Sequence, residues 1–151
     1  MSDYLLRPAT AHDEAFIRAL IRREHLDPFN VHWQNFLVAE ANGHIVGVGQ
    51  VKPFPGAREL GSLAVVPDYR RTGVGSTIIQ ALLAREQGTL VLFCLAFRER
   101  FYAKFGFRRA TLRDVPGALK VKYLLGLAFT RLFRQRLIVM VRPPDHLPAT
   151  A

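Results

Sequence analysis

The sequence predicts an α/β (α+β) fold in a single domain. Its 151 residues fit one domain of ordinary size. Short apolar runs typical of strands alternate along the chain with amphipathic runs typical of helices. One strand-like run, at residues 60–65, leads through a basic loop with two glycines into a helix-like run at 77–83. Together these observations indicate helices covering a sheet.

The elements of the N-terminal half follow from apolar periodicity and turn signals. A helix opened by Asp13 and Glu14 carries one apolar stripe, formed by Phe16, Ile17, Leu20 and Ile21. Asn42-Gly43 is the strongest hairpin signal of the chain. We therefore expect a strand at Tyr4–Thr10 ending at Pro8, that helix, a break at 27–30, strands at Phe36–Glu40 and His44–Lys52, a loop at 53–56 and a central strand at Arg58–Val66.

The C-terminal half continues the alternation. We expect a helix at about 74–87, a buried strand at 90–95, a helix at about 98–105, and strands at Phe107–Thr111 and Leu137–Val141. Residues 143–151 contain several prolines and are expected to form a short irregular tail, which leaves 1–142 as the domain.

The loop before the second helix has the features of an anion-binding site. A helix N-terminus offers unpaired backbone N–H groups and the positive end of its dipole. Gly73 and Gly75 let the backbone approach a phosphate, and Arg70 and Arg71 add permanent positive charge. Neither the Walker A pattern nor the dinucleotide fingerprint is present. The sequence therefore predicts a phosphate-bearing ligand of another kind.

Two motifs resemble those of the GNAT superfamily of N-acetyltransferases. Arg70, Gly73 and Gly75 match its Arg-x-x-Gly-x-Gly pyrophosphate motif, after a strand that ends in Val-x-Pro. The segment 101–107, Phe-Tyr-Ala-Lys-Phe-Gly-Phe, resembles its Tyr-x-Lys-x-Gly-Phe signature. The resemblance covers roughly residues 4–110. One departure is Leu95, since many members carry an Asn at about this position, near the pantetheine arm.

The resemblance implies a mixed central sheet flanked by helices, with acetyl-coenzyme A (acetyl-CoA) bound where the central strands splay apart at a β-bulge. It places the pantetheine arm along the central strand and the pyrophosphate on the loop. The cofactor-binding residues that it implies are Leu63, Ala64, Val65, Arg70, Arg71, Thr72, Gly73, Val74, Gly75 and Ser76.

Two residues are candidates for proton transfer. The resemblance places Tyr102 near the sulfur of CoA, where a phenol could donate a proton to the leaving thiolate; the alternative is an aromatic ring packed under the cofactor. Glu59 matches the general base of members that acetylate lysine; the alternative is a solvated carboxylate paired with Arg58 or Lys52. Cys94 is buried packing rather than a covalent carrier of the acetyl group, so we expect direct transfer in a ternary complex.

Charge is distributed unevenly along the chain. The net charge is +9, and residues 1–75 hold eight basic and eight acidic residues, whereas residues 76–151 hold thirteen and four. The excess lies mostly between Arg98 and Arg142 and exceeds what one cofactor needs. Three explanations of this excess remain open: an acidic partner, an anionic surface, or a solvated basic surface without a partner. Five scattered histidines show no spacing typical of metal ligands, so no metal is expected.

The basic segment Leu119–Arg136 is the least ordinary part of the sequence. Its apolar residues at helical spacing are Leu125, Ala128, Phe129 and Leu132, and its basic residues are Lys120, Lys122, Arg131, Arg134 and Arg136. Such a helix can lie on a membrane surface. The alternative is a helix that packs on the sheet and lines the acceptor site, and we favour this interpretation because a packed helix shows the same periodicity.

The sequence thus predicts an N-acetyltransferase that moves an acetyl group from acetyl-CoA to a primary amine of a small molecule or a protein. The alternatives are a catalytically silent CoA sensor and a basic module for nucleic acid or an anionic membrane. The single cysteine and the absence of a secretory signal or an apolar span favour the cytoplasm. The sequence leaves open whether the protein forms a homodimer.

Overall fold

The computed structural model describes residues 3–144 and divides them into two compact units. Unit 1 comprises residues 3–52 and 60–85, and unit 2 comprises residues 53–59 and 86–144. Residues 145–151, which hold most of the predicted tail, lie outside the described part, so the predicted boundary at residue 142 stays a prediction.

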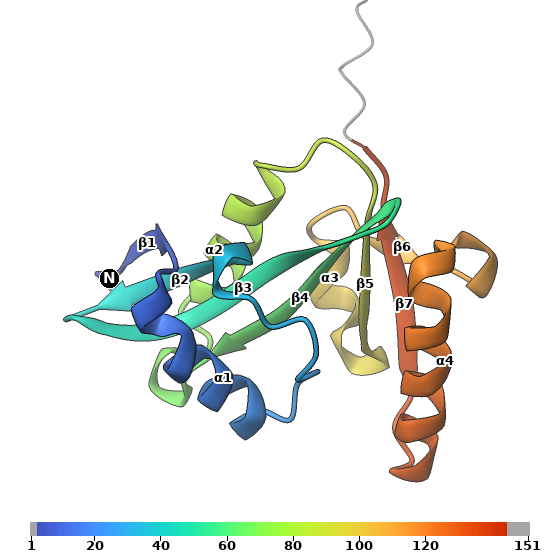
Figure 1. Ribbon diagram of the computed structural model, residues 1–151, viewed down its shortest axis with the longest axis horizontal. Coiled ribbons are helices and arrows are strands. Elements are labelled where there is room, and N and C mark those ends of the chain that lie inside the picture. The colour runs from blue at the N-terminus through green and yellow to red at the C-terminus, as the bar shows by residue number, and fades with distance from the viewer. Residues whose placement is uncertain (1–2, 145–151) are drawn as a thin grey trace, which may run out of the picture. The chain divides into compact units, whose positions relative to one another are not determined.

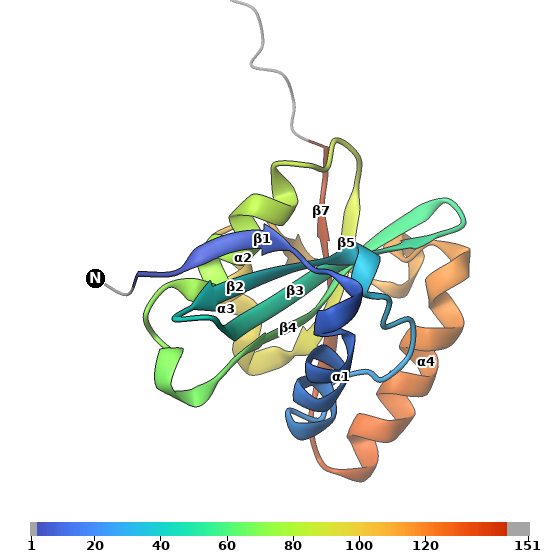
Figure 2. The ribbon, with the colours of Figure 1, turned by 60° about the vertical axis from the view of Figure 1, so that its left-hand side comes forward.

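Four strands build the sheet of unit 1, in the order β1-β2-β3-β4 (Figure 2). They span Leu5–Pro8 (β1), Phe36–Ala41 (β2), His44–Phe54 (β3) and Ala57–Val65 (β4). β1 and β3 both pair antiparallel with β2, and the hairpin between β2 and β3 turns at Asn42-Gly43, as predicted. The break predicted at 53–56 is shorter, because β3 runs on to Phe54 and leaves a turn at 55–56.

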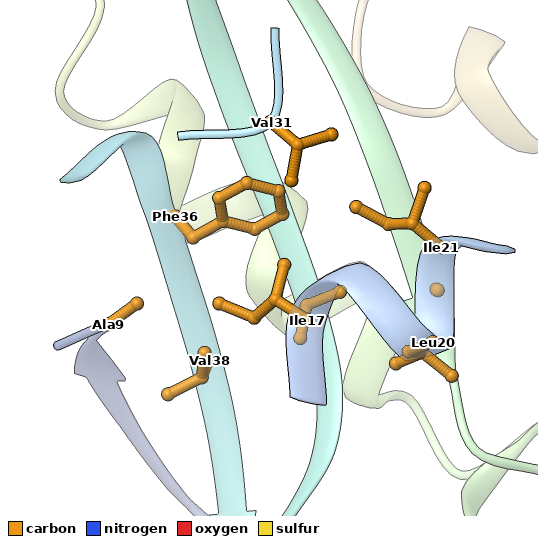
Figure 3. Packing of buried hydrophobic residues seen from close by; sticks show 9 residues of the cluster. Ala9, Ile17, Leu20, Ile21, Val31, Phe36 and Val38 are labelled. Atoms are coloured by element: carbon orange, nitrogen blue, oxygen red, sulfur yellow. The ribbon is translucent and has the colours of Figure 1, made fainter. Parts of the chain in front are cut away.

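Two helices cover opposite faces of this sheet. α1 (Glu14–Arg23) buries Ile17 and Ile21 on the face that carries Phe36 and Val48, and Ile17 points toward Phe36 (Figure 3). Side chains alternate between the faces of a strand, so the residues on either side of Val48 face the other way.

α2 (Val74–Leu83) packs on that second face. A Cβ built on Gly47 would lie 2.8 Å from Val74 Cγ1, and one built on Gly49 would lie 2.8 Å from Ile78 Cγ2. Because both positions lack a side chain, the backbone of β3 comes close to α2. This close packing holds the N-terminus of α2 beside the end of β4.

Unit 2 contains the remaining strands. They are β5 (Leu90–Leu95), β6 (Arg108–Arg109) and β7 (Leu137–Arg142), and β7 pairs antiparallel with both β5 and β6. The first residues of β4 also belong to this unit, and Glu59 pairs in parallel register with Val91 of β5. A parallel pair among antiparallel ones makes the sheet mixed, which confirms the predicted fold class.

The helices of unit 2 differ in detail from the prediction. The helix expected at about 98–105 is a short 3-10 turn at Ala96–Arg98 followed by α3 (Glu99–Ala103). α4 (Gly117–Leu132) lies alongside β7 (Figure 1) and ends before Arg134. The strand expected at Phe107–Thr111 is shortened to the two residues of β6, because a 3-10 turn begins at Leu112. Thr111 caps this turn: its hydroxyl and its backbone N–H both donate hydrogen bonds to the Asp114 carboxylate.

The face by which α4 packs is the main correction to the sequence analysis. α4 packs on the sheet, as favoured, through buried Leu119 and through Tyr123, whose ring stacks on Phe93 at 5.5 Å. The apolar stripe noted in the sequence faces solvent instead: Leu125, Phe129 and Leu132 are 67%, 65% and 79% exposed. A helix with apolar residues on two sides has two candidate packing faces, and periodicity alone does not choose between them.

Candidate active site

The loop between β4 and α2 forms a cradle of backbone N–H groups. Arg71 and Gly73 both adopt left-handed conformations, with φ of +61° and +92°, and Gly73 is the N-cap of α2. Glycine adopts this conformation without a steric penalty, and it supplies no side chain to cap the helix. The first N–H groups of α2, from Val74 to Ser76, therefore keep the free donors that an anion would bind.

Gly75 lies against the end of β4. A Cβ built on it would sit 3.6 Å from Val65 Cγ2 and 3.8 Å from Leu63 Cδ2, which is ordinary contact distance. The structure thus brings Leu63, Val65 and Gly75 together, as the predicted binding site requires. Ala64, between them in sequence, faces the α1 side and is 6% exposed, so only its backbone can serve a ligand on the α2 side.

The two arginines of the loop differ in their contacts. Arg70 Nε donates to the Val65 carbonyl at 3.1 Å, and its Nη2 donates to Glu24 Oε2 at 2.7 Å. Arg71 is exposed and has no ion pair among residues 3–144. Thr72 Oγ1 donates to the Tyr69 carbonyl and stiffens the loop. Arg71 is therefore the loop cation that stands ready for an anion, while Arg70 ties the loop to Glu24.

Ser62 marks an irregularity inside β4, the central strand in which the family resemblance predicts a β-bulge. Its φ of +55° is left-handed, an unusual conformation for a residue within a strand. Gln50 of β3 donates from Nε2 to Ser62 Oγ at 2.8 Å and so supports the kink. Such a kink is typical of a bulge, and small polar Gly61-Ser62 within an apolar run was the signal. Divergence of the central strands itself stays a prediction.

Glu59 lies at the start of β4 in a polar contact of its own. Its side chain is 5% exposed, and Lys122 Nζ of α4 lies 2.7 Å from each carboxylate oxygen. The alternative of a solvated carboxylate is therefore wrong. Arg58 pairs with Glu86, and Lys52 pairs with Asp27.

Lys122 is the residue at this site that sequence reasoning did not single out as a partner. Its ammonium also lies 5.8 Å from the ring centroids of Phe54 and Phe93, within the range of cation–π attraction. Sixty-three positions separate it from Glu59, so no local pattern links the two. Because both carboxylate oxygens face Lys122, an oxygen that turns away from Lys122 is the one available to a proton donor.

Tyr102 of α3 is half-buried among aromatic rings. It lies edge-on to Phe101 at 5.0 Å and to Phe107 at 6.3 Å between ring centroids. Burial, and to a smaller extent nearby Cys94, raises the pKa of Tyr102 to about 12. The phenol is thus protonated at neutral pH, as a proton donor must be.

Cys94 is a buried thiol of β5. Burial is the main cause that raises its pKa to about 11, so it stays protonated and unreactive at neutral pH. It lies three residues beyond Val91, the partner of Glu59, a spacing of about 10 Å along a strand. Cys94 therefore lies at a different level along β5 from the partner of Glu59.

Within residues 3–144, no group of three or more His, Cys, Asp or Glu side chains is placed to hold a metal ion. Nor does any helix in this range have the length and apolar character needed to cross a bilayer.

A mixed sheet whose central strand leads into an uncapped helix N-terminus defines a class of α/β domain that binds phosphate-bearing cofactors. Comparison with known proteins gives the particular family. The model of the acetyltransferase (GNAT) domain matches residues 32–109, and the chain belongs to the GNAT acetyltransferases, enzymes that use acetyl-CoA.

Similar proteins carry related descriptions. An amino-acid acetyltransferase of Ralstonia nicotianae is 38% identical over 87 aligned positions, in a match that covers 54% of this chain and 19% of that protein. The chain thus spans about a fifth of the length of the curated relatives it matches. N-acetylglutamate synthase of Neisseria gonorrhoeae, solved with coenzyme A and N-acetyl-glutamate, superposes with a TM-score of 0.77 at 20% identity, over 97% of this chain and 36% of its own.

A shorter protein gives a match over nearly its whole length. Rv2747 of Mycobacterium tuberculosis, solved in complex with CoA, has a TM-score of 0.74 at 21% identity and is covered to 98%, with 92% of this chain. At these identities the likeness of the solved structures concerns the fold.

Proposed function

We propose that this chain is an N-acetyltransferase that transfers an acetyl group from acetyl-CoA to the amino group of a small, acidic acceptor of the amino-acid class. Transfer is direct, within a ternary complex. The observation that carries the proposal is the cradle formed by Gly73, Gly75 and the first N–H groups of α2 beside Leu63 and Val65.

The residues of the cradle fit the proposed cofactor. Phosphate oxygens need several N–H donors converging on one point, which an uncapped helix start provides. Gly75 allows close approach, and Arg71 adds a permanent cation. Apolar Leu63 and Val65 offer a surface for the pantetheine arm. When bound, acetyl-CoA supplies an acyl group activated as a thioester.

The protein's own groups then manage protons. We assign Glu59 as the base that accepts a proton from the attacking amine, directly or through water, after it turns from Lys122. Tyr102 donates the proton of its hydroxyl to the leaving group. Cys94 takes no part, because its thiol stays protonated.

The acceptor class is supported by charge and by the relatives. A chain with a net charge of +9 attracts anionic acceptors and repels lysine-rich ones. Both curated relatives are named amino-acid acetyltransferase. A silent CoA sensor remains the second candidate, because the salt bridge to Lys122 restrains Glu59.

Calorimetric titration with acetyl-CoA, with ATP and NAD as controls, tests the cofactor. We expect selective binding with a micromolar Kd, about −8 kcal/mol. Gly75→Glu adds a carboxylate at the cradle, where its Cβ makes only ordinary contacts, and should weaken binding at least a hundredfold. Gln80→Glu, exposed on the same helix, is the matched control and should bind normally. Equal weak binding of all three ligands would make the loop a generic anion site.

Turnover is measured separately, as CoA thiol release with a panel of amino acids. Release with acidic amino acids and not with a lysine-rich peptide supports the proposed acceptor. Selective cofactor binding without turnover on any amine supports the sensor.

A further inference from the structure

α4 exposes far more apolar surface than any other segment of the described chain. Six of the eleven exposed large hydrophobic residues fall within thirteen positions: Val121, Leu124, Leu125, Phe129, Leu132 and Phe133. Scattered apolar residues on a surface need no explanation, but a contiguous patch of this kind marks an interaction surface. We call these six residues, five of α4 and its C-cap Phe133, the outer face of α4.

The charge around the outer face has one sign. Residues 115–144 contain no acidic residue, and their basic residues are Lys120, Lys122, Arg131, Arg134, Arg136 and Arg142. Lys120 and Arg131 lie eleven residues apart, about three turns, and so share one edge of the helix beside the outer face. Lys122 points inward to Glu59 and is not part of this edge.

We propose that the outer face of α4 docks the protein on an anionic phospholipid surface, with the helix lying in the plane of the interface. Apolar side chains would enter the boundary of headgroups and acyl chains, while Lys120 and Arg131 meet the lipid phosphates. The pair Phe129–Phe133, with ring centroids 4.9 Å apart, supplies aromatic anchors near the C-terminal end of the helix. Since no described helix is fit to cross a bilayer, binding stays at the surface.

Two other occupants fit less well. A second copy of the chain would bring two sets of cations together without a carboxylate between them, because residues 115–144 supply none. An acidic protein would satisfy the cations, but a bare apolar helix face needs a matching groove on such a partner. A lipid surface satisfies both the apolar and the charged parts without a preformed groove.

Co-sedimentation with vesicles tests the proposal on the full chain. One set of vesicles contains equal parts of phosphatidylglycerol and phosphatidylcholine, and the other contains phosphatidylcholine alone. We expect binding to the anionic set only, weakening as salt is raised. The double variant Leu125→Ser/Phe129→Ser should lower the partition coefficient at least tenfold. Phe29→Ser, 73% exposed in unit 1, is its control and should leave binding unchanged.

Charge is tested with Lys120→Gln/Arg131→Gln. Each cation near an anionic surface changes partition on the order of fivefold, so the pair should cost about 25-fold. Arg22→Gln/Arg85→Gln removes the same net charge from exposed positions of unit 1 and should cost less than about threefold. Unchanged acetyl-CoA binding in all variants separates this proposal from the proposed function.

Three outcomes would overturn the proposal. One is equal binding to both vesicle sets, or no binding to either set. Another is a dimer in sedimentation velocity that the serine variant dissolves, which would assign the face to a second copy. The third is binding to soluble polyglutamate that competes with vesicles and depends equally on Leu125 and Phe129, which would assign it to an acidic protein.

Discussion

Lys122 Nζ lies 2.7 Å from both carboxylate oxygens of Glu59, so a residue of α4 neutralises a buried charge at the start of the central strand. The carboxylate is almost fully buried, and the ammonium is 27% exposed. Burying one charge without its partner is costly, because the lost hydration is not replaced. The contact therefore links the stability of unit 2 to a proposed catalytic group.

Lys122→Met should lower the free energy of unfolding by about 3 kcal/mol, since it strands the Glu59 carboxylate. Urea denaturation measures the change. Lys120→Met, on an exposed position of the same helix, should stay within about 0.5 kcal/mol of wild type. The double variant Glu59→Gln/Lys122→Met should recover most of the loss, because no charge is left unpaired. A Lys122→Met protein as stable as Lys120→Met would contradict the buried pair.

Glu59→Gln should lower kcat/KM for the acetyl acceptor about a hundredfold, as expected for loss of a general base. The glutamine keeps the size of the side chain and can accept one hydrogen bond from Lys122. Steady-state kinetics and the pH profile of kcat/KM measure the effect, with Glu86→Gln, partner of Arg58, as the control for a lost ion pair. Near-normal kinetics would leave Glu59 with a structural role only.

Tyr102→Phe should lower kcat about a hundredfold while the Kd for acetyl-CoA stays within about twofold. Removing one hydroxyl leaves the ring packing on Phe101 and Phe107 intact. Because its pKa is about 12, Tyr102 should produce no inflection in the wild-type pH profile below about pH 10. Tyr123→Phe, stacked on Phe93, is the matched control. An unchanged kcat would assign Tyr102 to packing under the cofactor.

Asp13→Asn should remove acid-sensitive stability from unit 1. Arg7 donates to both Asp13 oxygens, at 2.8 and 3.1 Å, and is the main cause that lowers the pKa of Asp13 to about 2. A lowered pKa stabilises the fold above the unfolded value of 3.8, and this stability is lost as the pH falls toward 2.

The variant should therefore be less stable than wild type by about 2 kcal/mol at neutral pH, and the difference should close between about pH 4 and pH 2. Urea denaturation across this range gives the curves. Asp68→Asn, which changes an exposed carboxylate, should run parallel to wild type. A gap that stays constant with pH would show that the Asn substitution acts through packing instead.

Much of the fold was predictable because its signals are local. The apolar stripe of α1 and the Asn42-Gly43 turn act over a few residues, and both appear in the structure where the sequence places them. The loop at 70–76 was found for the same reason: its glycines and arginines are neighbours in sequence. Family membership then supplied the mixed sheet.

What the sequence analysis missed depends on contacts between distant positions. Lys122 looked like one of several surface cations until the fold placed it on Glu59. The side of α4 that packs was not predictable either, because Leu119 and Tyr123 compete with Leu125 and Phe129 for the sheet. Leu119 packs in one buried cluster with Val91 of β5 and Val139 of β7, so the choice depends on segments that are distant in sequence.

The glycines of β3 have a consequence for how this protein tolerates mutation. Gly47 and Gly49 belong to neither the phosphate cradle nor the proton-transfer pair, yet any side chain there meets α2 at 2.8 Å. A substitution would lift the helix and displace its N-terminus from Leu63 and Val65. In a saturation-mutagenesis screen for activity, these two positions would therefore score like ligand-binding residues without touching a ligand, and the strand surface under α2 would behave as a hidden part of the cofactor site.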